Sequence, residues 1–139
     1  MSRLHQASAV AIAGRAILIE GPSGSGKSSL VLALIDRGAT LIGDDGVALD
    51  AEDGRLLASP APAIAGLLEV RNVGLVRRQT AARVPVALVV RLDEAAPRFI
   101  EAAEQVERAG IAVPLVRLWP DSPVLHLRAE AALAQYGSP

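Results

Sequence analysis

Residues 21–29 decide the fold of this chain, and they read Gly21-Pro22-Ser23-Gly24-Ser25-Gly26-Lys27-Ser28-Ser29. The first eight match G-x-x-x-x-G-K-[ST], the pattern of a P-loop. In such a loop the glycines let backbone N–H groups close around phosphate oxygens, the lysine reaches the β- and γ-phosphates, and the serine hydroxyl ligates Mg²⁺. The sequence therefore predicts that these nine residues bind a nucleoside triphosphate.

The flanks of this stretch favour a P-loop over a chance glycine-rich turn. An apolar run at residues 16–19 precedes it and a helical apolar run at 30–35 follows it, which is the strand–loop–helix context that the motif requires. We expect residues 7–12 and 16–20 to form a hairpin that leads into the loop. The helix over 26–37 is apolar on nearly all sides, so it should be buried, and Gly38 should end it.

The size and the apolar composition restrict the architecture. With 139 residues the chain has room for one core, so we expect residues 1–139 to form a single domain. Half of the residues (51%) are hydrophobic but only 2% are aromatic, so small aliphatic side chains must build the core. The mean hydropathy of +0.36 is high for so small a domain, which favours a homo-oligomer that covers apolar surface.

The charges and the missing cysteines restrict the partners. The net charge is −1 and no basic cluster exceeds Arg77-Arg78, so we expect no nucleic-acid partner. No apolar run approaches the roughly 18 residues of a membrane span, and the N-terminus has no signal-peptide layout. Without cysteine the chain has no disulfide or thiolate metal site. We therefore expect a cytoplasmic protein with no membrane partner.

The remaining sequence predicts more strands than helices. Short strands are expected at 39–43, 47–49, 56–58, 67–70 and 73–76, an Asp-Gly hairpin at 50–54, and a buried central strand at 85–92. Residues 97–108 are helix-permissive, 111–118 are extended, and 123–136 should form a helix that Asp121 or Ser122 caps and Gly137 ends. We predict an α/β fold in which a P-loop-containing mixed β-sheet carries flanking helices.

A pair of carboxylates follows the strand that comes after the P-loop helix. Asp44 and Asp45 lie at the end of the strand predicted at 39–43, and a short βαβ return would bring that strand end close to the bound phosphates. One carboxylate could then hold Mg²⁺ while the other accepts the proton of an attacking hydroxyl. The alternative is that Asp-Asp-Gly only forms a turn.

A second charged pair lies in the predicted strand 67–70. Strand alternation places Glu69 and Arg71 on one face and apolar Leu68 and Val70 on the other. The carboxylate could complete a metal shell, and the guanidinium could bind phosphate oxygens. From spacing alone, a solvent-exposed ion pair is an equal alternative. His126 is expected to be a surface residue.

Four sequence features together resemble the catalytic C-terminal domain of the HPr kinase/phosphorylase family, in its short alphaproteobacterial form. They are His5 before the hairpin, the P-loop, Leu-Ile-Asp-Arg-Gly-Ala-Thr-Leu-Ile-Gly-Asp-Asp at 34–45, and Gly-Leu-Leu-Glu-Val-Arg-Asn-Val-Gly-Leu-Val at 66–76. The resemblance implies a fold related to phosphoenolpyruvate carboxykinase and an ATP- and Mg²⁺-dependent serine kinase. Its partner would be an HPr-type phosphocarrier of a phosphotransferase system, and its assembly is often a hexamer.

The resemblance also implies roles for the catalytic residues. Asp45 corresponds to the acid/base that deprotonates the target serine, and His5 to the histidine that supports it. Arg71 lies in the signature that both reaction directions share.

The phosphate and metal contacts follow in the same way. Lys27 would hold the phosphates. Ser28 and Glu69 would match the Mg²⁺ ligands, with Asp44 as a further helper of the metal.

The chain departs from the family pattern at three places. The separate N-terminal domain of full-length members is absent from these 139 residues. Asn72 stands where the family usually has glycine, so the backbone there must accept a side chain. Residues 119–123 read Trp-Pro-Asp-Ser-Pro in place of Arg-Pro-Gly-Arg-Asn, and Arg117 is the nearest candidate for the arginine that this loop supplies. We therefore expect the phosphorylase direction to be weak.

Two other functions stay open from the sequence. A P-loop kinase for a small molecule would need an arginine-rich lid, for which residues 76–83 with Arg77, Arg78 and Arg83 are the candidate. The other is a regulatory module that binds nucleotide through the P-loop but does not catalyse phosphoryl transfer.

The substitution Lys27→Ala should abolish triphosphate binding and leave the fold intact. The lysine contributes a positive charge on phosphate, whereas glycines hold the backbone of the loop. Isothermal titration calorimetry with ATP measures the effect. Unchanged ATP affinity in a folded variant would contradict the P-loop assignment.

Overall fold

The computed structural model describes residues 2–139 and consists of strands with two α-helices. The strands are β1 (Ser2–His5), β2 (Ser8–Ile12), β3 (Arg15–Glu20), β4 (Thr40–Gly43), β5 (Val47–Glu52), β6 (Arg55–Pro60), β7 (Leu67–Val70), β8 (Gly74–Arg77), β9 (Val84–Leu92), β10 (Glu104–Arg108) and β11 (Ile111–Leu118). The helices are α1 (Lys27–Asp36) and α2 (Leu125–Tyr136), and a short 3₁₀ turn, η1, spans Pro62–Ile64.

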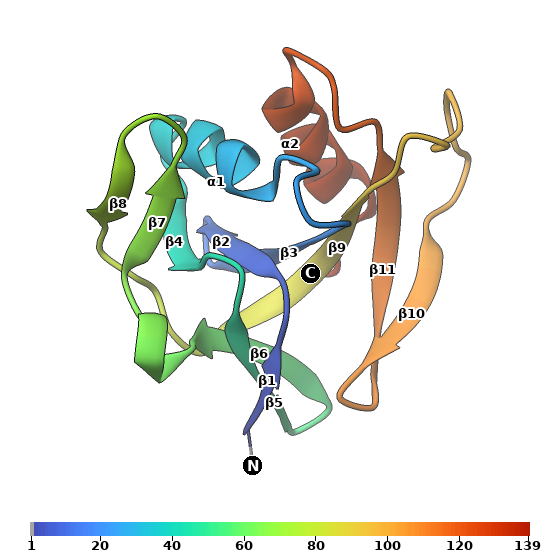
Figure 1. Cartoon of the computed structure of the whole chain (residues 1–139). Coiled ribbons are helices and arrows are strands. Elements are labelled where there is room, and N and C mark those ends of the chain that lie inside the picture. Colours follow the sequence, from blue (N-terminus) through green and yellow to red (C-terminus); the bar gives the residue numbers. More distant parts are fainter. Residues whose placement is uncertain (1) are drawn as a thin grey trace.

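Strand β9 forms the centre of a nine-stranded mixed sheet (Figure 1). It pairs in parallel with β3 on one side and β11 on the other, and its first residues pair antiparallel with β6. The path of the sheet is β1-β5-β6-β9-β3-β2-β4, with β10 added beside β11. The prediction of a buried central strand at 85–92 is therefore confirmed, as is the mixed sheet.

The alternation of side chains along β3 and β9 creates two cores. Ile17 and Ile19 face the two helices, whereas Leu18 between them faces the layer formed by β5 and β6. In β9, Leu88 and Val90 face the helices, and Val89 between them faces the opposite side of the sheet. This period of two is what a strand buried on both faces produces. Small aliphatic side chains fill both cores, as the composition predicted.

The connection from β3 to β4 brings two loops to one edge of the sheet. Strand β2 pairs antiparallel with both β3 and β4 and lies between them, so β3 and β4 run in the same direction. Helix α1 crosses over this group and packs beside α2 (Figure 1). The C-terminal ends of β3 and β4 therefore lie at the same edge, which is where ligands bind in open α/β sheets.

The segment 97–108 is helix-permissive by sequence, but it contains no helix in the structure. Residues 104–108 form β10, which pairs antiparallel with β11 through a two-residue turn at Ala109 and Gly110. Both turn residues have positive φ (50° and 81°), the geometry of a hairpin turn that matches the twist of the strands. Pairing with β11 overrides the local helix propensity of an alanine- and glutamate-rich segment.

The start of the last helix also differs from the sequence expectation. Helix α2 begins at Leu125 rather than Pro123, and no side chain caps it. The Ser122 hydroxyl instead accepts a hydrogen bond from the N–H of Val124 (3.2 Å) in the turn that precedes the helix. The helix ends at Gly137, as predicted. Neither helix in the described residues is long and apolar enough to cross a membrane.

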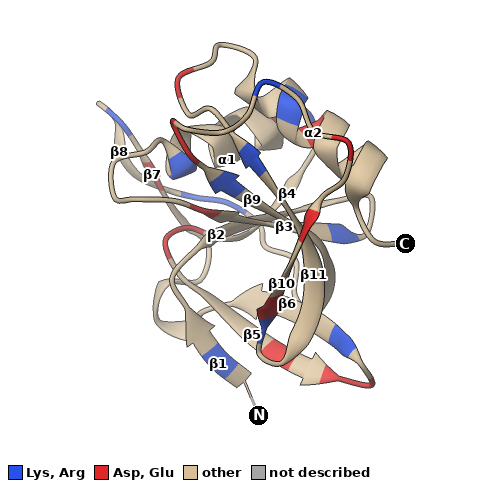
Figure 2. Cartoon of the chain, turned by 90° about the vertical axis from the view of Figure 1, so that its right-hand side faces the viewer, with Lys and Arg blue, Asp and Glu red and all other residues tan. Residues whose placement is uncertain are grey.

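Charged segments of both signs alternate along the strands and loops (Figure 2). Two acidic residues are buried, Asp44 and Glu20, and Glu20, the last residue of β3, is only 5% exposed. Arg108 of β10 donates two hydrogen bonds to its carboxylate (2.9 and 2.7 Å), and His5 Nε2 of β1 lies 2.8 Å from Oε2. Arg91 of β9 lies 3.9 Å away. One carboxylate thus connects four strands directly before the glycine-rich loop.

Burial alone would raise the pKa of Glu20, but the hydrogen bonds from Arg108 and His5 outweigh it and hold that pKa at about 2, against an ordinary value of 4.5. A pKa lowered by folding stabilises the native state above the unfolded-state value, and this stabilisation is lost as the pH falls through the folded-state value. The contribution of Glu20 should therefore be complete above pH 5 and fade toward pH 2.

The wild type should lose about 2 kcal/mol more unfolding free energy than Glu20→Gln between pH 5 and pH 3, because only the wild type must protonate this carboxylate. Urea denaturation at both pH values measures the difference. The control Glu130→Gln removes an exposed pair with Arg37 and should keep the full pH dependence. Equal pH dependence in the wild type and Glu20→Gln would show that Glu20 does not contribute in this way.

Candidate functional site

The glycine-rich loop, residues 21–26, connects β3 to the N-terminus of α1. Gly24 (φ 78°) and Gly26 (φ 98°) adopt left-handed conformations that favour glycine. Gly21 allows close packing, since an added Cβ would meet Ser25 Oγ at 2.8 Å. No side chain caps α1 at Gly26, so the first N–H groups of the helix remain available to an anion at its positive end.

Two polar side chains of the loop region have distinctive environments. Lys27 Nζ donates to the carbonyl oxygens of Gly21 and Pro22 (both 3.0 Å), so the ammonium lies folded back over the loop. Ser25 Oγ is buried and is the one such side-chain atom in residues 2–139 that has no hydrogen-bond partner. A buried polar atom without a partner is costly, and its place in this loop fits the oxygen-rich ligand that the glycines and the helix end would surround.

The buried carboxylate of Asp44, directly after β4, joins three other elements. Ser28 of α1 donates to Asp44 Oδ1 (2.7 Å) and Ser8 of β2 donates to the same oxygen (3.0 Å). The N–H of Glu69 in β7 donates to Oδ2 (3.0 Å). The predicted approach of the strand end to the loop is therefore confirmed. Because Ser28 gives its proton to Asp44, its oxygen lone pairs can face a cation.

The next residue, Asp45, has the opposite environment. Its side chain is exposed, its φ is +62°, and its N–H donates to Ser8 Oγ (3.1 Å). Its carboxylate accepts no hydrogen bond within the described residues and lines the cavity beside the loop. Asp44 is thus a buried, hydrogen-bonded carboxylate, whereas Asp45 is a free one, and this difference lets two adjacent acids perform different tasks.

The carboxylate cavity is a depression of about 630 Å³ between the loop, β4 and the hairpin of β7 and β8. It brings together most of the residues that the sequence singled out, namely Ser23, Gly24, Gly26, Lys27, Ser28, Ser29, Asp44, Asp45, Glu69 and Arg71. Arg71 has no hydrogen bond or ion pair among residues 2–139 and lies in the turn after β7. Asn72 beside it has φ 68°, so this position does favour glycine, as inferred above, and asparagine tolerates it.

The side-chain oxygen atoms that line this cavity fit a magnesium ion. Within residues 2–139, no three histidine, cysteine or acidic side chains are grouped to hold a metal by themselves. Mg²⁺ commonly binds through one or two carboxylates together with phosphate oxygens and water. Ser28, Asp44 and Glu69 supply that type of oxygen set beside the loop.

Two predicted site residues lie elsewhere. His5 does not line the cavity, and its ring contacts Glu20 at the base of the glycine-rich loop. Arg117 lies outside this cavity, and Asp93 (3.1 Å) and Glu104 (2.7 Å) hold its guanidinium. The hydrogen bonds that Arg117 donates, to Glu104 first and then to Asp93, raise the pKa of Arg117. The backbone N–H of Ala95 and then Arg117 lower the pKa of Asp93, and Arg117 lowers the pKa of Glu104.

The segment 76–83 does not form a lid over the cavity. Arg78 N–H and Ala81 N–H bond to the backbones of Gly66 and Leu41, and Arg83 Nη2 donates to Glu52 (2.7 Å). The arginines of this segment do not line the carboxylate cavity.

Sequence reasoning missed Ser8, whose hydroxyl connects Asp44 and Asp45. Its signal was a single polar residue inside the apolar run 7–12. Glu20 gave a similar signal, a charge at the end of a buried strand. Neither signal identifies the hydrogen-bond partner of the residue, because Ser8 lies 36 residues from Asp44 and Glu20 lies 88 residues from Arg108.

Comparison with known proteins gives a consistent result. The family model for the HPr serine kinase C-terminal domain matches residues 2–112. HPr kinase/phosphorylase of Streptococcus thermophilus is 35% identical over 122 residues, covering 78% of this chain and 40% of that protein. The Clostridium botulinum protein of the same name is 45% identical over 75 residues, covering 54% of this chain and 24% of its own length. This chain thus spans less than half the length of these relatives.

A solved structure resembles the fold over nearly the whole chain. The Hpr(Ser) kinase/phosphatase from Coxiella burnetii superposes with a TM-score of 0.83 at 24% identity, covering 95% of this chain and 94% of the other. At this identity the match establishes the shared fold.

The substitution Ser8→Ala should lower the unfolding free energy by about 1–3 kcal/mol, because it removes two hydrogen bonds from a fully buried hydroxyl. It should also release Asp45 from its orientation. Urea denaturation and the amide chemical shift of Asp45 measure the two effects. The control Ser2→Ala lies on exposed β1 and should change neither. A Ser8→Ala protein of wild-type stability with an unmoved Asp45 amide would contradict the role of Ser8.

Proposed function

Because the chain belongs to the HPr serine kinase C-terminal domain family, we propose that it is an ATP- and Mg²⁺-dependent protein-serine kinase whose substrate is an HPr-type phosphocarrier. Residues 1–139 would form one catalytic unit of this type. The observation that carries the proposal is the contact of Ser28 with Asp44 (2.7 Å) beside the free carboxylate of Asp45. It combines a metal-binding hydroxyl with an acid/base at one phosphate-binding loop. The relation of the fold to phosphoenolpyruvate carboxykinase stays a prediction.

The P-loop and the residues beside it would bind the triphosphate and its metal ion. We propose that residues 21–29 bind the triphosphate through backbone N–H groups, with Lys27 moving from the carbonyls of Gly21 and Pro22 onto phosphate oxygens. Ser28, Asp44 and Glu69 would hold Mg²⁺, whose charge neutralises the phosphates during transfer. Arg71, which has no partner within the described residues, would bind a phosphate oxygen with its guanidinium.

Asp45 would act on the hydroxyl group of the acceptor serine. The target serine oxygen attacks the γ-phosphorus, the bond from that phosphorus to the bridging oxygen of ADP breaks, and Asp45 takes the serine proton. We propose that His5 acts through Glu20 rather than on the substrate, because Glu20 directly precedes Gly21 and its contacts fix the start of the loop. The open carboxylate cavity leaves room for a protein acceptor, which favours a protein kinase over a small-molecule kinase.

Incubating the protein with labelled ATP, Mg²⁺ and the phosphocarriers of its own source tests the function. Asp45→Asn should keep Mg·ATP affinity and reduce transfer by about two to four orders of magnitude, the usual effect of a positioned base. Asp53→Asn is a matched control, because Asp53 is also exposed and also has positive φ (52°). Asp44→Asn should instead weaken metal binding. Absence of transfer to any phosphocarrier by the wild type would refute kinase function, and a fully active Asp45→Asn would refute the role of Asp45.

The reverse, phosphorylase direction should be much slower than the kinase direction. Attack of inorganic phosphate on phosphoserine brings two negative groups together, and arranged cations must offset their repulsion. Arg117 is held by Asp93 and Glu104, and Asp121 adds a negative charge to the segment 119–123, where the family pattern has arginine. Phosphoserine-HPr incubated with millimolar phosphate and Mg²⁺ should therefore release little pyrophosphate. Release at the kinase rate would show that another arginine supplies the charge.

The surroundings of the enzyme are part of the proposal. ATP as phosphoryl donor favours the cytoplasm as its location. Several large apolar side chains are exposed, among them Leu4 (78%), Leu75 (69%) and Phe99 (76%), and they support a homo-oligomer, which sedimentation velocity would test. We propose neither a nucleic-acid nor a membrane partner. A regulatory module that only binds nucleotide is the alternative, and the transfer assay separates the two.

A further inference from the structure

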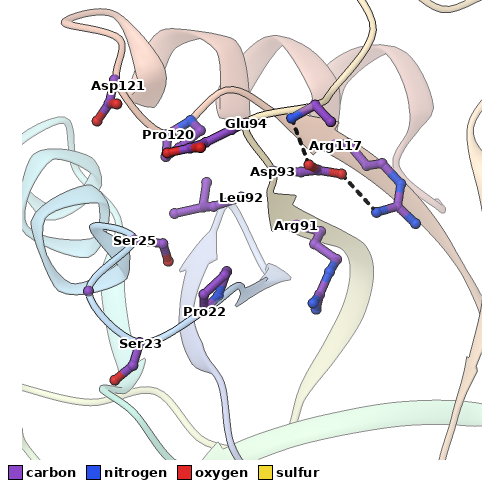
Figure 3. Close-up of a pocket in the computed structure, with 12 residues that line it drawn as sticks. Pro22, Ser23, Ser25, Arg91, Leu92, Asp93, Glu94, Arg117, Pro120 and Asp121 are labelled. Carbon is purple, nitrogen blue, oxygen red and sulfur yellow. Dashed lines mark hydrogen bonds and ion pairs between the residues drawn. The ribbon is translucent and has the colours of Figure 1, made fainter.

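A second cavity, which we call the β9–β11 cavity, lies on the other side of the glycine-rich loop (Figure 3). Its volume is about 620 Å³, within the roughly 300–1,000 Å³ of small-molecule sites. The loop forms one wall, and the residues that follow β9 and β11 form the other. The parallel strands β3, β9 and β11 therefore all end at this cavity, which is the position at which open α/β sheets bind ligands.

The two cavities meet at the loop. Ser23 and Gly24 line both of them, so a ligand held by the loop can extend into each. The reacting phosphate must lie in the carboxylate cavity, because Asp45 and the proposed metal ligands are there. The other end of the nucleotide must leave the loop on the opposite side, where the β9–β11 cavity begins.

The charges of the β9–β11 cavity suit a ligand that donates hydrogen bonds. Its arginines are engaged, Arg117 by Asp93 and Glu104 and Arg91 near Glu20. Glu94 and Asp121 line the far wall and have no hydrogen bond or ion pair among residues 2–139 (Figure 3). Ionised carboxylates only accept hydrogen bonds. Glu94 and Asp121 would repel a phosphate group. They would accept hydrogen bonds from the hydroxyls of a sugar, as an acidic residue does in dinucleotide sites.

The remaining lining suits a flat, largely apolar ring. Pro22 projects from the loop wall and Pro120 from the opposite wall, and Leu92 lies between them at the floor (Figure 3). Pockets for small ligands combine such apolar surface with a few polar groups.

We propose that the β9–β11 cavity binds the nucleoside half of the triphosphate, with Glu94 and Asp121 accepting hydrogen bonds from the ribose 2′- and 3′-hydroxyls. The inference rests on the proposed function, since it assumes that the loop holds the phosphates. It assigns nucleotide selectivity to two residues outside the P-loop.

Calorimetry with three probes tests the proposal: Mg·ATP, Mg·2′,3′-dideoxy-ATP and inorganic tripolyphosphate. ATP should bind at least tenfold tighter than either other probe, because a hydrogen bond to a charged group contributes about that factor. Glu94→Ala with Asp121→Ala should reduce ATP affinity to that of dideoxy-ATP and leave tripolyphosphate unchanged. Glu101→Ala, an exposed acid outside both cavities, is the control.

A second variant tests the cavity while leaving Glu94 and Asp121 unchanged. Ala95→Trp should fill the β9–β11 cavity and remove the advantage of ATP over tripolyphosphate, whereas Ala102→Trp, on the exposed surface, should not. Equal binding of ATP and tripolyphosphate by the wild type would overturn the nucleoside site while leaving the P-loop assignment valid. Equal binding of ATP and dideoxy-ATP would overturn the ribose contacts. Failure of every probe to bind would overturn the proposed function, and the inference with it.

Discussion

The hydrogen bonds around Asp44 are the interaction on which the candidate site depends. Its two oxygens take protons from Ser28, Ser8 and the N–H of Glu69, so one carboxylate fixes the positions of α1, β2 and β7 relative to β4. A buried carboxylate requires such donors, because desolvation without them is costly. The same requirement that stabilises Asp44 therefore holds the Ser28 hydroxyl at the start of α1 and the wall of the carboxylate cavity in place.

Ser8 extends this constraint to the neighbouring acid. Its hydroxyl donates to Asp44 and accepts from the N–H of Asp45, which lies in a left-handed conformation. The backbone turn at Asp45 directs one carboxylate into the core and leaves the next exposed. Two chemically identical side chains acquire different environments through one small hydroxyl, and this difference supports the separate roles that we propose for them.

The glycine-rich loop receives support from both of its ends. On one side Ser28 is held by Asp44, and on the other Glu20 is held by Arg108 and His5. Between these anchors the loop separates two cavities of similar size, each lined by two basic and three acidic residues. The carboxylate cavity has a free cation, Arg71, beside its acids, whereas the arginines of the β9–β11 cavity are already engaged. We propose that this difference in the availability of cations orients a bound triphosphate with its reactive end toward Asp45.

The sequence by itself determined the strand–loop–helix around residues 21–29, the buried strand β9 and the approach of Asp44 to Ser28, because these follow from local spacing and from a short crossover. It did not determine the conformation of residues 104–108, whose local composition favours a helix, or the partners of Ser8, Glu20 and Arg117. Those depend on strand pairing and on contacts between residues far apart along the chain. Tertiary structure decided them, because a buried polar group takes whichever donor the folded backbone brings within hydrogen-bond distance, and no local pattern encodes that distance.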